Sequence, residues 1–513
     1  MNSKLPRLAE RSSARGSPAP ESRGPQQRRP QSTTGGRWGS FYRNLTSLPG
    51  LDYLMIRITV LLLTGIGVVI VLSSSMTWSY IEGSGVWGTG GRQAAMVAVG
   101  FAAFWVALKI HPSRIRKFAP WLLAGTFVIM IAVLTPLGVG REEVGAQSWL
   151  SLGPLQLQPS EVAKVVIAVW GAGLLADNSR TGRGWGNPFT KFSLVATALA
   201  LLNLLQGDLG TTLSFAATVV VLLIFAGVRM QWVWGMMIAA GLGSIALVLM
   251  GRGFRSARVE VFFNSLFGKF EDTQGQAFQS YQGFLSLADG SVFGVGLGQS
   301  RAKWFYLPEA KNDFIFAIIG EELGLWGGGL VIVLFGLLGV FGLRTAIRAQ
   351  DQFQSLLAAT LTAGIVSQAF INIGYVIGLL PVTGIQLPML SSGGTSAIIT
   401  LGSMGLLANC ARHEPDAVSA MQSYGRPLFD RLFFLGEPRP AGGAVEKVSA
   451  SRKPARFGAP VTQRRPEADR GTTKRAPRGP DPTETEYRQS ASPRRRRSVP
   501  PEQRHRPGRD ESR

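Results

Sequence analysis

Cysteine and histidine are nearly missing from this 513-residue chain, which has one cysteine, Cys410, and three histidines. A single cysteine excludes an intramolecular disulfide and a metal site built from cysteine thiolates. The histidines, His111, His413 and His505, are too scattered in the sequence to indicate a metal cluster. Any chemistry must therefore come from other side chains.

Acidic residues are also scarce, because 31 Asp and Glu stand against 53 Lys and Arg. The ends carry most of the imbalance, with net charges of +7 for residues 1–50 and +10 for residues 412–513. Basic, low-complexity ends favour anionic lipid or acidic protein partners, and no nucleic acid partner is expected. We predict disordered basic tails at 1–50 and 413–513 around a folded part at 51–412. Within the second tail, only Met421–Leu435 has enough apolar residues for a short interfacial or partner-docked segment.

Charged residues are rare over residues 51–411, where long apolar blocks alternate with short charged loops. This pattern predicts an all-α polytopic membrane protein. A cleavable signal peptide is not indicated, because fifty polar residues precede the first apolar block. The ten apolar blocks fall at 54–75, 93–110, 119–136, 160–177, 191–206, 210–228, 232–250, 314–343, 356–380 and 395–411.

Basic residues concentrate on alternate loops between these blocks, which predicts the orientation of the chain. Loops on the predicted inner side are basic, and the outer loops have mixed charge. We therefore expect ten transmembrane helices, both termini in the cytoplasm, and a large outer loop at 251–313 between helices 7 and 8. The inner segments are Lys109–Lys117, Arg180–Arg183, the turn at Arg229, and Arg344–Arg348.

Two ionisable residues, Glu161 and Lys164, follow Pro159 at the outer start of the fourth block. Pro159 suits the first turn of a helix, and the spacing of three places Glu161 and Lys164 on one face. Ionisable groups at such a depth usually face the protein interior or a wet cavity. A structural ion pair and a substrate-binding role are both open. Trp149, just before this helix, is either an interfacial anchor or part of a sugar site.

The most informative carboxylate is Asp313, which ends a polar loop and runs directly into the eighth apolar block. It is either the N-cap of a helix beginning at Phe314 or a general base at the membrane surface. Glu321 is about 12 Å further along a helix, so Glu321 and Glu322 are interpreted as buried hydrogen-bonding groups. Asp208 is expected to cap the helix that begins at Leu209.

Two further outer segments have residues suited to a ligand. The long loop contains Arg258, Gln279 and Gln282, and arginine can bind a pyrophosphate in a bidentate way or extend to lipid phosphate. The polar stretch around Ser391, Gly393 and Gly394 interrupts two apolar blocks. Irregular backbone at that depth lines a cavity or packs within protein, so a substrate groove and a re-entrant hairpin both fit.

In order and spacing these motifs resemble those of the SEDS (shape, elongation, division and sporulation) family of bacterial peptidoglycan polymerases. The similarity covers residues 50–412 and rests on Trp149 with Gln158–Lys164, on Leu307–Gly324, and on Leu380–Gly394. It implies glycosyl transfer from lipid II, an undecaprenyl-pyrophosphate disaccharide-pentapeptide, outside the cytoplasmic membrane. The residues that it implies are Asp313 as the essential aspartate and general base, with Glu161, Lys164, Trp149, Arg258, Gln279, Gln282, Ser391, Gly393 and Gly394 toward the substrate.

The resemblance also implies partners, namely a class B penicillin-binding protein transpeptidase and other divisome proteins. The long tails favour the cell-division branch of the family, acting at the septum, over the elongation branch with the same chemistry. A lipid II transporter is an alternative, disfavoured because the polar residues gather in the outer half of the membrane. A scaffold role through the basic tails can coexist with catalysis. No cofactor is indicated with certainty, and assistance from Mg²⁺ or Mn²⁺ stays open.

Some positions depart from the family pattern. Lys311 and Asn312 stand where the family usually has His-Thr, Gly283 where it has serine, and Ser392 where it has tyrosine. None of these changes removes the predicted base. We therefore expect an active enzyme whose Lys311 alters the electrostatics around Asp313.

Overall fold

The computed structural model describes residues 48–438, with gaps at 82, 86, 141–145, 154, 178–185, 251–260, 265–277, 303–306 and 308–309. Arg258 and the inner-loop arginines Arg180 and Arg183 lie outside the described residues. So do residues 1–47 and 439–513, which hold most of the predicted tails.

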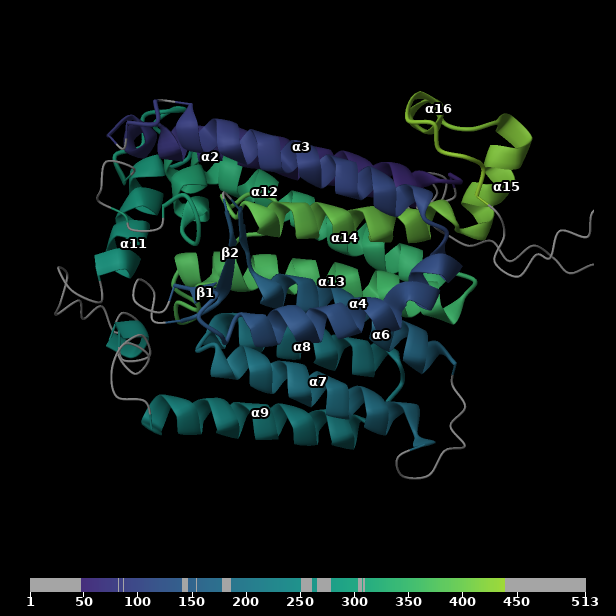
Figure 1. The fold of residues 1–513 in the computed structure, drawn as a ribbon. Coiled ribbons are helices and arrows are strands. Elements are labelled where there is room, and N and C mark those ends of the chain that lie inside the picture. Colours follow the sequence, from purple (N-terminus) through teal and green to yellow (C-terminus); the bar gives the residue numbers. More distant parts are fainter. Residues whose placement is uncertain are drawn as a thin grey trace, which may run out of the picture. The chain divides into compact units, whose positions relative to one another are not determined.

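The described chain is mostly helical, and its long helices run alongside one another (Figure 1). Each apolar block predicted from the sequence overlaps one of these helices. They are α2 (Leu51–Ile81), α3 (Gly88–Lys109), α4 (Pro112–Ala132), α6 (Pro159–Ala176), α7 (Pro188–Leu205), α8 (Leu209–Phe225), α9 (Met230–Met250), α12 (Ile315–Arg348), α13 (Gln352–Val376) and α14 (Thr395–Arg412).

Seven helices of the described chain are long and apolar enough to cross a membrane, which makes this a multi-pass membrane protein. They are α2, α3, α4, α6, α7, α12 and α13, and α8 is a shorter apolar helix. Helix α13 is packed on several sides, since it contacts α6, α8, α12 and α14. Polar side chains on α13 consequently face other helices rather than lipid.

Several helices begin at residues with capping side chains. The Asp208 carboxylate accepts a hydrogen bond of 3.0 Å from the Thr211 backbone N–H, so the predicted cap of α8 is confirmed. Asn187 and Asp351 accept from backbone N–H groups at the starts of α7 and α13 in the same way. Pro159 lies in the first turn of α6, where a missing N–H costs nothing.

The expectation of a purely helical protein needs one correction. Residues 138–157 contain a three-stranded antiparallel sheet of β1 (Gly138–Val139), β2 (Trp149–Leu152) and β3 (Leu155–Leu157), in the order β1-β2-β3. The strands are too short for a sequence period to reveal them. The Thr395 hydroxyl donates to the Gln156 carbonyl at 2.5 Å, which ties the sheet to the start of α14.

The long outer loop also contains regular structure, helix α11 (Phe278–Gly290), which packs against α12. A Cβ atom at Gly290 would lie 1.9 Å from the Gly320 carbonyl oxygen, so this close approach requires glycine. In Figure 1, α11 and the strands lie at the same end of the helices. This end is the predicted outer side.

At the opposite end, the segment predicted to begin a disordered tail is folded. Residues after α14 form α15 (Pro415–Tyr424) and α16 (Leu428–Leu432), where a disordered tail from residue 413 was expected. The cause is a buried carboxylate, Asp430, which accepts hydrogen bonds from the Tyr53 hydroxyl at 2.8 Å and the Arg412 guanidinium at 2.7 Å. The contact with Tyr53 spans 377 residues of sequence, so local composition could not predict it.

Candidate active site

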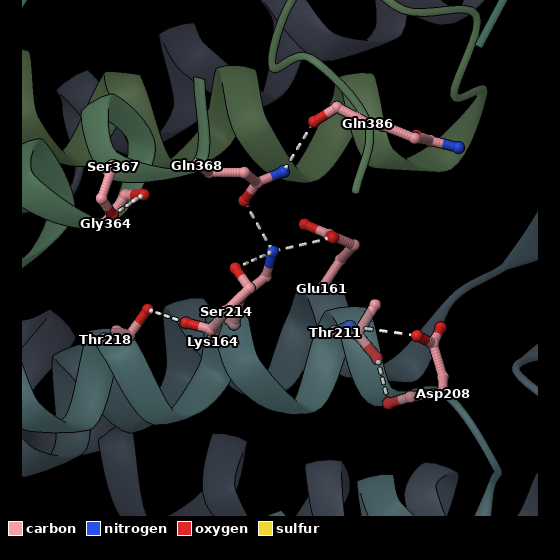
Figure 2. A network of polar contacts seen from close by, with 10 residues as sticks. All are labelled: Glu161, Lys164, Asp208, Thr211, Ser214, Thr218, Gly364, Ser367, Gln368 and Gln386. Carbon is pink, nitrogen blue, oxygen red and sulfur yellow. Dashed lines mark hydrogen bonds and ion pairs between the residues drawn. The ribbon is translucent and has the colours of Figure 1, made fainter. Parts of the chain in front are cut away.

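Lys164 lies at the centre of a buried polar network near the outer start of α6. Its ammonium group donates to the Glu161 carboxylate at 2.8 Å, the Gln368 side-chain oxygen at 2.7 Å and the Ser214 hydroxyl at 3.4 Å (Figure 2). Both Lys164 and Glu161 are buried. The ion pair between them is therefore present, and the three donors of the ammonium are divided among a carboxylate, an amide and a hydroxyl. A role toward substrate stays a prediction.

Helix α13 connects this network to the predicted base. Gln368, Asn372 and Tyr375 are spaced by four and three residues, so they share one face of α13. The amide group of Gln368 accepts from Lys164 and donates to the Gln386 carbonyl at 3.1 Å. One helical turn on, Asn372 and Tyr375 bond to the residues around Asp313. We call these three side chains the α13 polar face.

The backbone of Asp313 is fixed by two donors from the α13 polar face. The Asn372 amide donates to the Asp313 carbonyl at 2.9 Å, and the Tyr375 hydroxyl lies 3.0 Å from the same oxygen. Both groups also reach the Ile385 carbonyl, each at 2.7 Å. Since Asn372 is fully buried and Tyr375 nearly so, these bonds exchange little with water. They hold two chain segments against one helix.

One of the two interpretations of Asp313, that it is the N-cap of the following helix, is wrong. Helix α12 starts at Ile315, and its N-cap position is Phe314, which makes no side-chain cap bond. Phe314 is buried with its ring 5.8 Å from that of Tyr375. Asp313 itself is half-buried, so it lies where a buried helix start meets the outer surface. This placement leaves the general-base interpretation, which the structure does not test.

The polar stretch before α14 packs directly against the residues that precede Asp313. The Ser391 hydroxyl donates to the Asn312 carbonyl at 2.7 Å, and the Ser392 backbone N–H donates to the Lys311 carbonyl at 3.0 Å. The Ser392 hydroxyl also bonds to the Asn312 side chain. Two positions that depart from the family pattern, Asn312 and Ser392, are therefore partners in space.

The two predicted glycines of this stretch have different structural reasons. A Cβ atom at Gly393 would lie 2.4 Å from the Gln386 side-chain oxygen, so the site is crowded. Gly394 has φ of 51° at the N-cap of α14, a conformation that residues with side chains rarely adopt. The structure brings Ser391, Gly393 and Gly394 to the Asp313 side of the bundle, where their contact with substrate stays a prediction.

Helix α11 brings Gln279 and Gln282 toward the same region. Its Gly283 packs on Phe314, because a Cβ atom there would lie 3.0 Å from the phenylalanine ring. This contact explains how glycine is accommodated at a position where serine is expected. Gln279 and Gln282 are half-buried on the same turn of α11 as Gly283. The residue that Gly283 contacts, Phe314, directly follows Asp313 in the chain.

Glu321 and Glu322 are structural, as predicted. Glu321 accepts from the Ser300 hydroxyl at 2.7 Å and the Arg301 backbone N–H at 2.6 Å, and Glu322 accepts from the Ser73 hydroxyl at 2.6 Å. Gly324, with φ of 66° and ψ of −162°, interrupts α12 just beyond them. The carbonyls of both glutamates then accept from Val295 and Gly296 instead of the helix. These bonds attach the outer loop to α12.

Trp149 begins β2, where it pairs with Val139 and packs its ring on Gly140. It is half-buried in a sheet that is tied to the start of α14, at the predicted outer end. Among the described residues it makes no hydrogen bond to the Lys164 network. Asp208 is occupied as a helix cap and as an acceptor for the Ser148 hydroxyl at 3.2 Å. Among the described residues, Asp208 makes no hydrogen bond or ion pair with Lys164.

The described part of the chain contains no group of three or more His, Cys, Asp and Glu side chains able to hold a metal ion. A divalent cation shared between one carboxylate and the phosphates of a substrate needs no such group. The question of Mg²⁺ or Mn²⁺ therefore stays open.

The sequence reasoning missed the α13 polar face altogether. Gln368, Asn372 and Tyr375 interrupt the apolar block 356–380 at a helical spacing, and polar side chains within a membrane helix are costly unless they have partners. That signal was available in the sequence. Ser214 on α8 carried no comparable signal, because a lone serine is common in such helices.

Comparisons with known proteins agree with this arrangement. Residues 53–416 match the family model of the FtsW, RodA and SpoVE type, described as cell cycle protein. A probable peptidoglycan glycosyltransferase FtsW of Mycobacterium tuberculosis is 40% identical over 395 residues, covering 76% of this chain and 74% of that protein. Stage V sporulation protein E of Bacillus subtilis is 35% identical over 362 residues, covering 71% and 97%.

Solved structures share the fold. A chain of a complex described as coordinating polymerization and crosslinking in a peptidoglycan synthase matches with a TM-score of 0.56 at 24% identity, covering 70% of this chain and 96% of that one. The rod shape determining protein RodA of Thermus thermophilus matches with a TM-score of 0.51 at the same identity, covering 70% and 96%. At this identity the likeness concerns the fold alone.

Proposed function

From the premise that this chain belongs to the FtsW, RodA and SpoVE family of cell cycle proteins, we propose that it is a peptidoglycan glycosyltransferase that polymerises lipid II. The relatives that carry this activity in their names cover most of the membrane-spanning part. None of those names describes a transporter, so the transport alternative has no separate support. The reaction extends glycan strands at the outer face of the cytoplasmic membrane.

The observation that carries the proposal is the α13 polar face. It holds the backbone of Asp313 through Asn372 and Tyr375 and the ammonium of Lys164 through Gln368. The backbone of Asp313 and the Lys164 ammonium are thereby held by residues of the same helix, Asn372 and Gln368, which are four residues or roughly 6 Å apart along its axis. A base and a cation held at fixed positions suit the transfer of a sugar from a pyrophosphate.

The proposed reaction needs one base. The Asp313 carboxylate removes the proton from the 4-hydroxyl of the acceptor sugar while that oxygen attacks the anomeric carbon of the donor. The bond between this carbon and the pyrophosphate oxygen breaks, and the α-linked pyrophosphate becomes a β-1,4 glycoside with inversion. Positive charge from Lys164, and from Arg258 in the long outer loop, stabilises the departing pyrophosphate. Glu161 orients Lys164 by their ion pair.

The remaining polar residues are proposed to bind the sugars and the phosphates. Gln279 and Gln282 approach from α11, and Trp149 approaches from the sheet. Ser391, Gly393 and Gly394 are proposed to bind the substrate from the stretch before α14, where glycine lets the backbone come close to a ligand.

We propose ten transmembrane helices with both termini in the cytoplasm. The seven long apolar helices, the shorter α8, and the helices α9 and α14 supply that number. The basic segments Lys109–Lys117 and Arg344–Arg348 support the inner assignment of their ends. In this topology the folded membrane part is 51–412, and Asp313 faces outward.

The proposed partner is a class B penicillin-binding protein, a transpeptidase that crosslinks the new strands. The solved complex with a similar fold joins polymerization to crosslinking, which supports this pairing. Relatives named FtsW support a place at the division septum among other divisome proteins, rather than in elongation. The basic tails are proposed to contact anionic lipid.

The test is reconstitution of the full chain with its partner transpeptidase and labelled lipid II, followed by electrophoresis of the glycan product. Asp313→Ala should lower polymerisation by about 10²–10⁴-fold, the usual contribution of a general base. Asp289→Ala is the matched control, because Asp289 is an exposed carboxylate on α11. Polymer from the Asp313 variant at the wild-type rate, or no polymer from the wild type, would contradict the assignment.

A further inference from the structure

The folded segment after α14 has a surface that the catalytic function does not use. This segment, residues 415–438, comprises α15, α16 and the chain that turns back behind them. The fully buried Asp430 attaches this segment to the helices, because it accepts hydrogen bonds from Tyr53 of α2 and Arg412 of α14. Leu435, also fully buried, lies on the same inward side. The segment is therefore part of the folded body of the protein.

The segment lies beside the membrane-facing surface of α3. The Trp105 indole N–H donates to the Phe433 carbonyl at 2.9 Å, and the Lys109 ammonium lies 3.8 Å from the centre of the Trp105 ring. Tryptophan and lysine in the last turn of a membrane helix mark the boundary between hydrocarbon and headgroups. Val106, between them, is exposed on the lipid-facing side. Figure 1 shows α15 and α16 at the same end of the bundle.

The outward side of the segment is apolar. Leu428 is 81% exposed, Leu432 is 67% exposed and Phe434 is 82% exposed. Leu428 and Leu432 are one helical turn apart, so they share a face. Two exposed arginines, Arg426 and Arg431, stand next to these apolar residues. A basic and apolar surface at the end of membrane helices is typical of segments that lie in the membrane interface.

We propose that residues 424–434 form a membrane-surface element that inserts Leu428, Leu432 and Phe434 into the cytoplasmic leaflet. Arg426 and Arg431 bind the phosphates of anionic lipids there. The occupant is lipid rather than another protein because the element is bonded to Trp105 of α3, next to the exposed Val106, near the end of a helix that is long and apolar enough to cross a membrane. Burial of Asp430 beneath the element fixes its depth and orientation. The proposal requires only the topology, so it does not depend on the glycosyltransferase assignment.

The test uses the full chain in nanodiscs that hold one copy. The native Cys410 is buried, so a new surface cysteine can be labelled selectively with an environment-sensitive fluorophore. Leu432→Cys carries the label, and Ser419→Cys, an exposed position on α15, is the matched control. The wild-type chain, treated with the same fluorophore, gives the background signal from labelling at positions other than the new cysteine.

The label at 432 should emit at shorter wavelength than the label at 419 and be quenched about twofold more by lipids brominated near the headgroup. Replacing neutral lipid with anionic phosphatidylglycerol should strengthen both signals, and Arg426→Gln with Arg431→Gln should remove that increase. Equal emission and quenching at 432 and 419 would overturn the proposal. An apolar signal at 432 that appears only in discs with two copies would also overturn it, by assigning the surface to a second chain.

Discussion

The inner and outer ends of the bundle both bury polar and charged side chains, but they organise them differently. At the inner end, Asp430 meets Tyr53 and Arg412, while Asp52 meets Arg344 at 3.2 Å and Arg348 at 3.7 Å. Each carboxylate there is matched by cations or a hydroxyl from other helices. At the outer end, neutral amide and hydroxyl groups of the α13 polar face bind backbone carbonyls and share one ammonium.

This difference indicates that the polar contacts at the inner end join helices to one another, whereas those at the outer end position the candidate site residues. At the inner end, an ion pair joins α16 to α14, a hydrogen bond from Tyr53 joins α16 to α2, and the ion pairs of Asp52 join α2 to α12. Side chains at the outer end instead hold the backbone of Asp313 and the ammonium of Lys164, the two residues proposed to take part in the reaction. The comparison predicts that variants of the outer end lose activity beyond any loss of stability, whereas inner variants lose stability alone.

The largest effect is expected at Lys164. Lys164→Met leaves the Glu161 carboxylate buried without its cation, which should cost about 3–5 kcal/mol of stability and abolish polymerisation. Adding Glu161→Gln should restore the melting temperature, because the uncompensated charge is gone, but not the polymer. Thermal unfolding and the glycan gel are the measurements.

The melting temperature and polymer yield of that double variant are compared with those of Glu161→Gln alone, which keeps the Lys164 ammonium. At the inner end, Arg412→Met with Asp430→Asn should lower the melting temperature and leave the activity of the folded protein unchanged. Recovery of both stability and polymer in the outer double variant would reduce Lys164 and Glu161 to a structural pair, and the comparison would fail.

A smaller effect is expected from the donors behind Asp313. Asn372→Leu or Tyr375→Phe should lower kcat about tenfold with little change in KM, since the loss of a buried hydrogen bond of about 1–1.5 kcal/mol misplaces the base. Ser367→Ala is the control, because Ser367 lies on α13 and bonds only to its own helix at Gly364 in Figure 2. Equal rates for all three variants would show that the α13 polar face does not position Asp313.

The smallest effect concerns Glu414, at the inner end between α14 and α15. Burial, reinforced by Asp52 and opposed by Arg348 and Arg344, raises the pKa of the Glu414 carboxyl from 4.5 to about 7. Between these values the folded chain holds a proton that the unfolded chain releases, so this group lowers stability as the pH rises through that window.

Glu414→Gln removes that dependence. The variant should melt close to the wild type at pH 5 and a few degrees above it at pH 8, as measured by thermal unfolding. Glu437→Gln is the control, because Glu437 is exposed. A difference between variant and wild type that stays the same at both pH values would contradict the assignment.

Much of the fold could be predicted from hydropathy, because apolar runs of helical length have few alternatives in a membrane. The cap at Asp208 and the structural role of Glu321 and Glu322 followed from local spacing. The sheet at 138–157 could not be predicted, since strands of two to four residues depend on contacts with α14. Helices α15 and α16 could not be predicted for a similar reason, because Asp430 bonds to Tyr53, which is 377 residues away in sequence.

The sequence was enough to select candidate site residues, but not the contacts that hold them. Asp313, Lys164 and Glu161 stood out because ionisable groups in a membrane need a reason. Asn372 and Tyr375 are uncharged, and nothing in their sequence neighbourhood shows that they reach Asp313. Hydrogen bonds between distant segments, such as Ser391 to Asn312, become visible only when the helices are packed.

The face shared by Gln368, Asn372 and Tyr375 also fixes the distance along α13 between two points of attachment. The points at which Lys164 and the Asp313 backbone are held are separated by one turn of α13, a length determined by peptide geometry rather than by the fit of side chains. When α13 tilts or shifts as a rigid rod, both points travel together and their spacing is preserved. The spacing of these two attachment points therefore depends on the helical conformation of α13 between residues 368 and 375.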